Sequence, residues 1–470
     1  MLTSPQTQRA DRSAPPAAPD AAAVAGADPF VGLLARIMSR EARIGVIGLG
    51  YVGLPLAKVF WNQGYRITGF DIDPEKVGAL SEGDSYIKSF PANTVRALNA
   101  SGRFTATTDF GDLVRSDAIL ICVPTPLADN REPDLSYVED TAKVVAAWLR
   151  PGQLVVLEST TYPGTTLDVV KPILESGGLT SGSDFYLAYS PEREDPGNPE
   201  FETEQIPKVV GGDGMAALQL ANALYAQAVV RTVTVSSTQT AEAVKLTENI
   251  FRAVNIALVN ELKLVYAAMG IDVWEVIEAA KTKPFGFMPF YPGPGLGGHC
   301  IPIDPFYLSW RARRDDIETR FIELAGEINT AMPRYVVERL AAALEARHGR
   351  SLTGARVLLV GLAYKKNVDD TRESPGLEIM ELLQAYGATV DYHDPHVAAI
   401  PVTRNHPTLT GKRSIPWTAD AIAGFDAALI CTDHDALDYA CLAEHAPLIV
   451  DTRNVMARVG FKSADNVVKA

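Results

Sequence analysis

The sequence predicts an α/β protein with two doubly wound parallel-sheet domains that are joined by a long central helix. Three observations support this prediction. An apolar run, a glycine-rich turn and a helical pattern follow one another at residues 43–57. The same strand pattern returns at residues 355–363. Between these two regions lies a long helical pattern at residues 240–269, which suits a connection between two domains.

The chain is long, apolar enough to fold and acidic. It has 470 residues, of which 47% are hydrophobic, and can therefore bury the cores of two or three domains. Its net charge of −14 argues against nucleic acid as a partner. The four cysteines show no framework spacing, so we expect a reducing, cytoplasmic environment. Residues 284–303 lack charge, but their five prolines and five glycines exclude a spanning helix, and we expect no membrane partner.

These patterns divide the chain into four segments. Residues 1–38, rich in alanine and proline, are predicted to be a disordered tail and lead-in. Residues 39–235 are predicted to form the first α/β domain, and residues 346–470 the second. The helical segment between them, 236–345, is predicted to carry a dimerisation surface.

The predicted dimer surface is an apolar stripe on the long helix. Its members are Val244, Phe251, Val254, Leu258, Leu262 and Val265. A stripe of this length exceeds what the edge of one neighbouring domain usually covers, so we expect a homodimer or a higher homo-oligomer.

The turn at residues 48–53 fits the GxGxxG fingerprint of a Rossmann-like dinucleotide site. It follows a strand pattern, opens a helix and precedes a second strand that ends at Asp71. The spacing from Gly48 to Asp71 lets the acid reach the ribose hydroxyls of adenosine, which favours NAD over NADP. Gly50 and Gly53 complete the predicted cofactor turn. The alternative is a glycine turn without a ligand.

Further polar residues follow predicted strands, at the edge where parallel sheets collect ligands. Thr160 follows the strand at residues 154–158, and Glu192 follows the strand at residues 185–189. We expect both side chains in one crevice. The alternatives are a turn cap for Thr160 and a solvated loop acid for Glu192.

A polar stripe on the long helix consists of Lys245, Asn249 and Arg252. Their spacing of i, i+4 and i+7 places them on a face different from that of the apolar residues. In most helices such a stripe is a solvated face, so the pattern by itself does not identify a site.

One cysteine stands apart from the others. Cys300 lies in a glycine-rich segment, with Asp304 four residues later, whereas the other three lie in strand or helix patterns. A loop thiol can act as a nucleophile if a neighbouring group stabilises its thiolate; a structural cysteine in a turn is the alternative. Cys300 and His299 have no partners at metal-ligand spacing, so we expect no metal.

The second α/β domain lacks the glycine fingerprint. Gly361 is followed by Leu, Ala, Tyr, Lys and Lys. This domain is therefore expected to bind something other than a dinucleotide, such as a nucleotide diphosphate held by Lys365.

Six motifs in this order resemble the UDP-glucose/GDP-mannose dehydrogenase family, from about residue 42 to the C-terminal region. The motifs are residues 48–53, 159–161, 190–192, 245–249, 297–304 and 365–374. The resemblance implies NAD as the cofactor and a UDP-sugar as the substrate. It places cofactor contacts on Gly48, Gly50, Tyr51, Val52, Gly53, Asp71, Lys76, Thr125, Thr160 and Arg372. It places substrate contacts on Glu192, Arg193, Lys245, Asn249, Tyr291, Gly297 and Lys365.

The resemblance also implies a mechanism. The catalytic residues would be Cys300, Lys245, Asn249, Asp304, Glu192 and Thr160. The expected reaction is a four-electron oxidation of a sugar C6 alcohol to a carboxylate through a cysteine thiohemiacetal and thioester. Lys245 and Asn249 would stabilise the developing oxyanion. The sequence leaves open whether Glu192 or Asp304 is the general base.

Within this family, residues 283–308 and 190–197 are most similar to the branch that oxidises UDP-N-acetylglucosamine for surface polysaccharides. Glucose-type members carry a second glutamate four residues after the position of Glu192, where this chain has Pro196. UDP-glucose is therefore the less expected substrate. UDP-N-acetylgalactosamine stays open, because the sequence gives no clear account of the pocket around C4.

Two other classes of protein fit this sequence less well. A two-electron β-hydroxyacid dehydrogenase needs neither a cysteine nucleophile nor a second α/β domain. A regulator that binds a nucleotide sugar without turnover would be expected to lose Cys300, Lys245 or Asp304, and all three are present.

Overall fold

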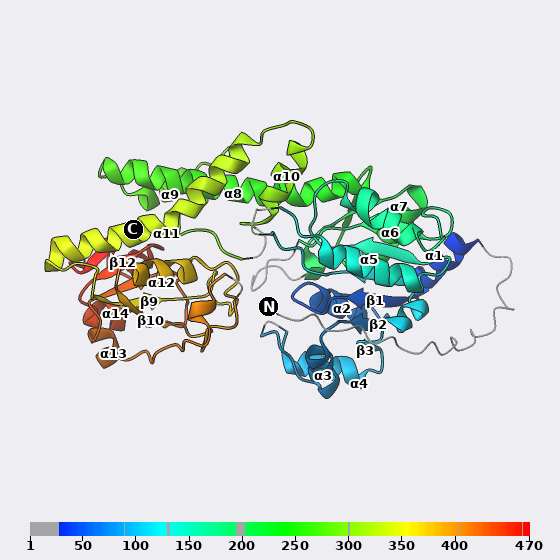
Figure 1. Ribbon diagram of the computed structural model, residues 1–470, viewed down its shortest axis with the longest axis horizontal. Coiled ribbons are helices and arrows are strands. Elements are labelled where there is room, and N and C mark those ends of the chain that lie inside the picture. Colours follow the sequence, from blue (N-terminus) through cyan, green and yellow to red (C-terminus); the bar gives the residue numbers. More distant parts are fainter. Residues whose placement is uncertain are drawn as a thin grey trace, which may run out of the picture.

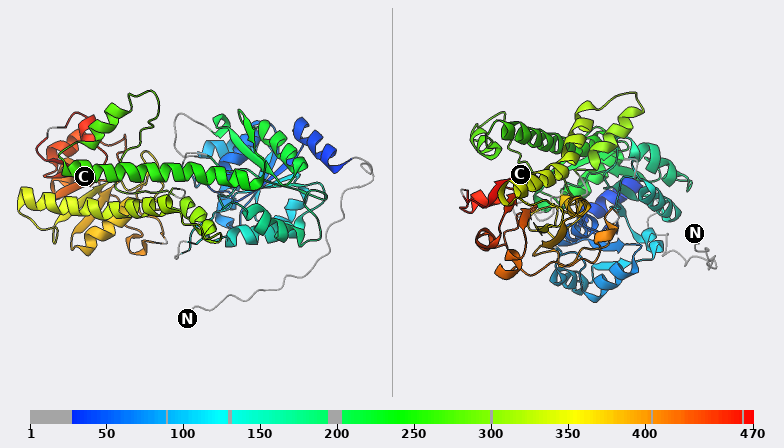
Figure 2. Two further views of the ribbon diagram at one scale, coloured as in Figure 1. Left: turned by 90° about the horizontal axis from the view of Figure 1, so that it is seen from above. Right: turned by 60° about the vertical axis from the view of Figure 1, so that its left-hand side comes forward.

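The computed structural model describes residues 28–88, 90–128, 132–193, 203–298, 301–403, 405–462 and 464–470. Two α/β domains lie at opposite ends of an elongated molecule, and the long helix α8 (Thr238–Ala268) runs from one to the other (Figures 1 and 2). This is the predicted fold class. No described helix combines the length and the apolar composition that a bilayer crossing requires.

The first domain contains, in the described part of the chain, an eight-stranded sheet in the order β3-β2-β1-β4-β5-β6-β7-β8. The first six strands run parallel in the order that dinucleotide-binding domains use. Strand β7 runs antiparallel to β6, and β8 extends the sheet parallel to β7. The strands are β1 (Arg43–Ile47), β2 (Arg66–Phe70), β3 (Phe104–Thr107), β4 (Ala118–Ile121), β5 (Leu154–Leu157), β6 (Tyr186–Tyr189), β7 (Lys208–Gly212) and β8 (Thr232–Thr234).

Helices cover both faces of this sheet (Figure 1). They are α1 (Pro29–Ser39), α2 (Gly53–Asn62), α3 (Pro74–Glu82), α4 (Ala92–Ala100), α5 (Ser136–Trp148), α6 (Lys171–Glu175) and α7 (Met215–Ala226). Because β4 and β5 are buried along their whole length, they read as continuous apolar runs rather than as alternating patterns.

Helix α1 changes the predicted start of the first domain. Asp28 caps the helix by accepting a hydrogen bond from the Phe30 backbone N–H, and Leu33 and Ile37 are fully buried in the core. Folded structure therefore begins before residue 39, and the predicted lead-in up to residue 38 contains a core helix. Residues 1–27 lie outside the described residues.

The second domain is also doubly wound. Its described residues form a five-stranded parallel sheet in the order β10-β9-β11-β12-β13. In chain order this is 2-1-3-4-5, the other common doubly wound arrangement. The strands are β9 (Arg356–Val360), β10 (Thr389–His393), β11 (Ala427–Ile430), β12 (Ile449–Asp451) and β13 (Val467–Lys469). The helices are α12 (Pro375–Ala385), α13 (Ala419–Ala423), α14 (Tyr439–His445) and α15 (Val455–Arg458).

The central region is helical. It consists of α8, α9 (Val273–Ala280), α10 (Asp304–Arg313) and α11 (Arg320–His348), and α11 packs along α8 (Figure 2).

Helix α8 buries a polar face and exposes an apolar one. Glu242, Lys245, Asn249, Asn260 and Lys263 are among its buried residues. In contrast, three members of the predicted apolar stripe, Phe251, Leu258 and Val265, are exposed by 49%, 51% and 40%. The interpretation of Lys245 and Asn249 as a solvated face is therefore wrong, whereas Arg252 is exposed as that interpretation requires.

Candidate active site

The three glycines of the turn after β1 have three different physical roles. Gly48 has a positive φ of 92°, and a Cβ there would lie 2.7 Å from the Cys122 carbonyl oxygen. A Cβ on Gly53 would lie 1.9 Å from the Gly48 oxygen, so only glycine lets α2 begin this close to the turn. A Cβ on Gly50 would meet no described atom within 4 Å. The space beside Gly50 lets a phosphate approach the backbone at the N-terminus of α2.

Asp71 stands at the carboxyl end of β2 and is 6% exposed. Its carboxylate accepts hydrogen bonds from the backbone N–H groups of Leu49 (2.9 Å) and Asp73 (3.0 Å), and Lys76 Nζ lies 3.6 Å away. The acid is thus fixed beside the glycine turn, where the ribose of a dinucleotide lies in this fold. Asp71 and Lys76 fit the predicted cofactor site.

The second domain reaches the glycine turn through one arginine. The Arg372 guanidinium lies over the Tyr51 ring at 4.7 Å and is paired with Asp370 at 2.7 Å. Residue Val52 is half-buried at the start of α2. The structure therefore brings the predicted cofactor residues Tyr51, Val52 and Arg372 to the same turn.

Two predicted residues lie after the central strands of the first sheet. Thr125 is 4% exposed, and its carbonyl accepts a short hydrogen bond from the hydroxyl of Tyr307 on α10. Thr160 is half-buried after β5. Tyr307 thus joins the ligand edge of the sheet to the central helical region.

The buried polar face of α8 meets the first residue of α10. Asn249 Nδ2 donates a hydrogen bond of 2.5 Å to Asp304 Oδ2. Lys245, one turn earlier on α8, attracts the same carboxylate, and all three residues are at most 6% exposed. The structure therefore brings Lys245, Asn249 and Asp304, which we call the helix cluster, together from two separate motifs.

Burial changes the acidity of Asp304. Desolvation raises the pKa of this carboxyl to about 7, and the attraction of Lys245 and the hydrogen bond from Asn249 lower it only in part. A carboxyl that titrates near neutral pH can take up and release protons under working conditions, which a general base requires.

The second candidate acid, Glu192, lies in a different buried network. Lys208 Nζ is 3.9 Å from Glu192 and 2.5 Å from Glu158, and Tyr225 donates a short hydrogen bond to Glu158. Burial raises the pKa of Glu158 to about 7. The next predicted residue, Arg193, is paired with Glu248 on α8 at 2.6 Å. Sequence reasoning missed Lys208 and Glu158, since each reads as an ordinary strand-end residue.

The glycine-rich run before Cys300 is packed against the second domain. A Cβ on Gly297 would lie 2.6 Å from the Cβ of Tyr364, and the Gly298 N–H donates to the Arg372 carbonyl at 3.0 Å. Lys365, which follows Tyr364, is half-buried. This contact places the segment that contains the predicted substrate residue Gly297 next to the segment that contains the predicted substrate residue Lys365.

Tyr291 lies just before the glycines of the same segment. Its ring stacks on Trp274 at 5.7 Å, and its hydroxyl donates to Glu278 at 2.8 Å. Asn260 on α8 holds the run by accepting a hydrogen bond from the Gly293 N–H at 3.0 Å. The predicted nucleophile Cys300 lies outside the described residues, together with His299 and Pro196.

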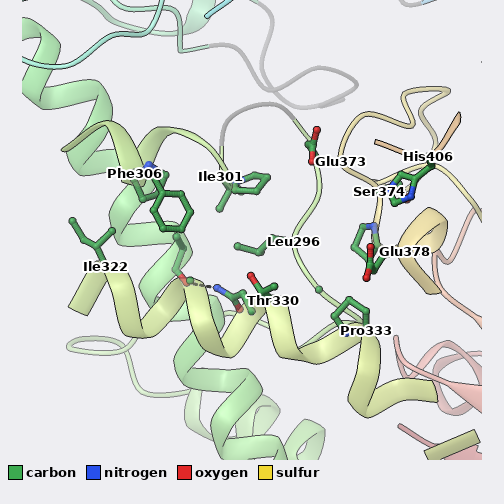
Figure 3. Close-up of a pocket in the computed structure, with 17 residues that line it drawn as sticks. Leu296, Ile301, Phe306, Ile322, Thr330, Pro333, Glu373, Ser374, Glu378 and His406 are labelled. Carbon is green, nitrogen blue, oxygen red and sulfur yellow. Dashed lines mark hydrogen bonds between the residues drawn. The ribbon is translucent and has the colours of Figure 1, made fainter. Parts of the chain in front are cut away.

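A cavity of about 260 Å³ lies beside this run, between α8, α10, α11 and the start of α12 (Figure 3). Phe306, Ile322 and Pro333 form its apolar side, and Glu378 and His406 its polar side. Its described lining residues include no member of the helix cluster. The helix cluster therefore does not line the cavity, whereas Ile301 and Pro302, which follow the predicted nucleophile in the chain, do.

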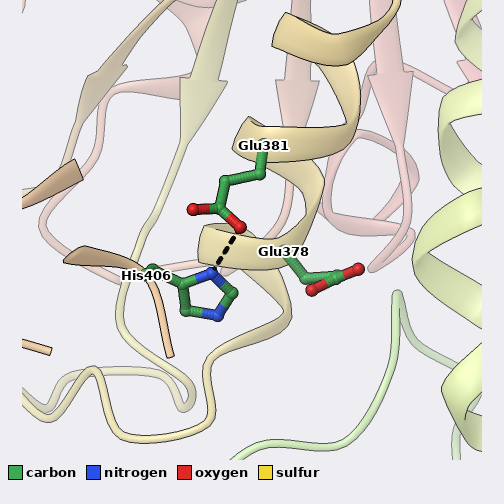
Figure 4. A group of neighbouring side chains, drawn as sticks. All are labelled: Glu378, Glu381 and His406. Carbon is green, nitrogen blue, oxygen red and sulfur yellow. Dashed lines mark hydrogen bonds and ion pairs between the residues drawn. The ribbon is translucent and has the colours of Figure 1, made fainter. Parts of the chain in front are cut away.

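Glu378, Glu381 and His406 gather at the polar edge of this cavity (Figure 4). Their potential ligand atoms all lie within 4.8 Å of one another, and His406 Nδ1 is 2.8 Å from Glu381 Oε2. The His406 imidazole and the Glu381 carboxylate are thus partners of each other. The expectation of no metal concerned Cys300 and His299 and stays a prediction.

Comparison with known proteins matches three family domains to this chain. The UDP-glucose/GDP-mannose dehydrogenase NAD binding domain matches residues 42–229, the central domain residues 239–331, and the UDP binding domain residues 358–458. A UDP-N-acetyl-D-glucosamine 6-dehydrogenase from Pseudomonas aeruginosa is 38% identical over 363 residues, 77% of this chain and 84% of the relative.

Two further matches come from Pyrococcus horikoshii. A UDP-N-acetyl-D-mannosamine dehydrogenase is 36% identical over 427 residues, which cover 89% of this chain and 97% of the relative. A solved structure of a UDP-D-ManNAc dehydrogenase superposes with a TM-score of 0.81 at 35% identity, over 91% of this chain and 98% of that one. With these matches, the chain belongs to the UDP-glucose/GDP-mannose dehydrogenase family and is an NAD-dependent nucleotide-sugar dehydrogenase.

Proposed function

We propose that this protein oxidises the C6 alcohol of UDP-N-acetylglucosamine to the uronic acid, a precursor for surface polysaccharides. The observation that supports this most directly is the helix cluster. A lysine, an amide donor and an acid with a pKa near 7 meet in one buried place. Oxidation of an alcohol needs such a set, because a proton leaves the hydroxyl and negative charge develops on the oxygen.

The chemistry proceeds in two oxidations. When bound, NAD accepts the hydride that C6 loses in each of them. Lys245 and Asn249 stabilise the oxyanion that forms on the C6 oxygen, and Asp304 takes up the hydroxyl proton. Cys300 thiolate adds to the aldehyde, and loss of the second hydride leaves a thioester. Water then cleaves the thioester, which releases the carboxylate and the thiol.

The geometry favours Asp304 over Glu192 as the general base. Asp304 contacts Asn249 and is attracted by Lys245, and its pKa lies near neutral pH. Glu192 instead faces Lys208, which is itself paired with Glu158. We therefore assign Glu192 to substrate positioning, together with Thr160.

The identity of the sugar has two candidates. The likeness of residues 283–308 and Pro196 to the hexosamine branch supports UDP-N-acetylglucosamine, as does the name of the Pseudomonas relative. The names of the Pyrococcus relative and structure favour UDP-N-acetylmannosamine, which differs only in configuration at C2. A pocket shaped for one configuration leaves a polar acetamido group unpaired in the other, which costs about 1–3 kcal/mol.

The test is a comparison of kcat/KM for NADH formation with UDP-N-acetylglucosamine, UDP-N-acetylmannosamine, UDP-N-acetylgalactosamine and UDP-glucose. We expect UDP-N-acetylglucosamine to lead by about tenfold to a hundredfold. A lead for UDP-N-acetylmannosamine would transfer the assignment to the second candidate. Equal rates with UDP-glucose would remove the hexosamine assignment.

We also propose that the protein is a homodimer through the exposed apolar face of α8. Phe251, Leu258 and Val265 lie seven residues apart and are all at least 40% exposed. The Phe290 ring lies against that of Phe251, with the ring centroids 5.7 Å apart, and extends this surface. An apolar face of this length is costly in water, and a second copy offers the same face for burial.

A further inference from the structure

Lys263 on α8 is a buried cation without a partner. Its side chain is 5% exposed, and its Nζ makes no hydrogen bond in the described part of the chain. No described carboxylate, the terminal one of Ala470 included, lies within ion-pair distance of Nζ. The ammonium lies over the Tyr335 ring, whose centroid is 5.4 Å from Nζ. A ring quadrupole compensates a buried ammonium far less than an anion does.

The charges nearest to Lys263 are mostly positive. Arg453 and Arg339 repel its ammonium and Asp451 attracts it. The Asp451 carboxylate is already occupied, because it accepts hydrogen bonds from the Arg453 and Met456 backbone N–H groups at 2.9 and 2.8 Å. Three cationic side chains therefore face one committed side-chain carboxylate, which leaves an excess of positive charge among these side chains when Lys263 is protonated.

A cavity of about 320 Å³ lies against this group of charges. Its lining residues include Lys263, Tyr335, Arg339, Trp274, Asp272 and Lys469, together with Ala470. Asp272 and Lys469 neutralise each other in an ion pair at 2.5 Å. Arg339 Nε, like Lys263 Nζ, makes no hydrogen bond within the described residues. The cavity thus brings together two cationic side chains with unused donors.

We propose that this cavity binds a phosphate group, either free or carried by a small organic molecule, between Lys263 and Arg339. Phosphate matches the site in two respects. Its charge lies between one and two at neutral pH, which balances the excess of positive charge. The forked guanidinium of Arg339 suits a tetrahedral oxyanion, and the flexible lysine stem lets the ammonium turn toward it.

This phosphate cavity is separate from the active site. Its described lining residues include neither the helix cluster nor the segment from Tyr291 to Gly298. The two sites are nonetheless connected, since Trp274 in the cavity wall stacks on Tyr291. A ligand in the cavity can therefore act on the segment that contains Tyr291 through the Trp274 ring.

Binding should depend on pH in a defined direction. Burial, followed by the repulsion of Arg453, lowers the pKa of Lys263 to about 7, and Asp451 opposes this shift. A bound anion favours the charged lysine, so binding takes up a proton. Sulfate, whose own charge does not change near neutral pH, should bind more weakly as the pH rises above 7. Arg339, Lys469 and Asp272 are the other charged side chains that line the cavity.

The test is calorimetric titration of the full chain with inorganic phosphate, sulfate and a phosphomonoester. Phosphate that binds to the substrate's own subsites is common to all variants and is distinguished by its independence of residue 263. We compare Lys263→Met, Lys263→Arg and the exposed control Lys143→Met. Lys263→Met should weaken phosphate binding at least tenfold, whereas Lys263→Arg and Lys143→Met should retain it.

Each outcome decides the proposal. Tighter binding of the phosphomonoester than of free phosphate would identify an organic phosphate as the ligand, and equal binding would identify phosphate itself. A thermal midpoint of Lys263→Met at or above that of the native protein in phosphate-free buffer would show that the variant folds. Absence of binding at millimolar phosphate, or unchanged binding by Lys263→Met, would refute the site.

Discussion

Replacement of Asp304 by asparagine should stabilise the protein while it destroys activity. Asp304 is 1% exposed, and burial raises its pKa from 3.8 to about 7. The folded state therefore holds a proton that the unfolded state has released between these two pH values, so this group makes folding less favourable as the pH rises. The cost is absent below pH 3.8, grows up to about pH 7 and is constant above it.

The size of this effect follows from the two pKa values. Their difference of about 3 corresponds to about 4 kcal/mol at pH 8, at about 1.36 kcal/mol for each pKa unit. At pH 5 the same reasoning gives about 2 kcal/mol, since the pH is then only about 1.2 above the unperturbed value. Asparagine keeps the shape and never ionises, so Asp304→Asn should be relieved of this cost.

Thermal unfolding at pH 5 and pH 8 measures the effect. The midpoint of Asp304→Asn should exceed that of the native protein at both values, and by more at pH 8. The exposed control Asp316→Asn, which retains its left-handed backbone, should show no pH-dependent gain. An Asp304→Asn variant that is less stable at pH 8 than at pH 5, relative to the native protein, would refute the assignment of a costly buried charge.

Three further predictions follow from the structure. Gly50→Ala should fold with an unchanged thermal midpoint but raise KM for NAD, because its Cβ would occupy the open space beside the turn, whereas Gly53→Ala should lower the midpoint itself. NADP should support a kcat/KM lower by about a hundredfold, because the fixed Asp71 carboxylate repels a 2′-phosphate; equal use of both cofactors would contradict this placement. Leu258→Asp should convert the proposed dimer to a monomer in sedimentation velocity at micromolar concentration, and a native protein that is already monomeric would remove the proposed interface.

Local sequence signals were sufficient for the dinucleotide turn. The strand, the three glycines and Asp71 all lie within one βαβ unit, so their spacing alone fixes their geometry. The structure gives Gly48 and Gly53 the close contacts, and Gly50 the open space, that the pattern requires. The repeated strand pattern also predicted that the second domain is doubly wound. The order of the five strands in its sheet could not be predicted, because strand order depends on long-range pairing.

The inward direction of Lys245 and Asn249 could not be read from helical periodicity. A polar stripe normally faces water, and on α8 the partner that makes it a buried face is Asp304, which lies 55 residues from Asn249. The same holds for Glu242, which accepts hydrogen bonds from Gly164 and Thr166 and so anchors a segment of the first domain. Long-range polar partners determine which face of this helix is the interior.

The yield of NADH per molecule of UDP-N-acetylglucosamine tests the proposed function most directly. The native protein should form two molecules of NADH for each molecule of the uronic acid, because the sugar loses two hydrides before release. Cys300→Ala should bind NAD but form no uronic acid, since no thioester can arise without the thiol. A yield of one, or native-like uronic acid formation by Cys300→Ala, would contradict the covalent two-step oxidation.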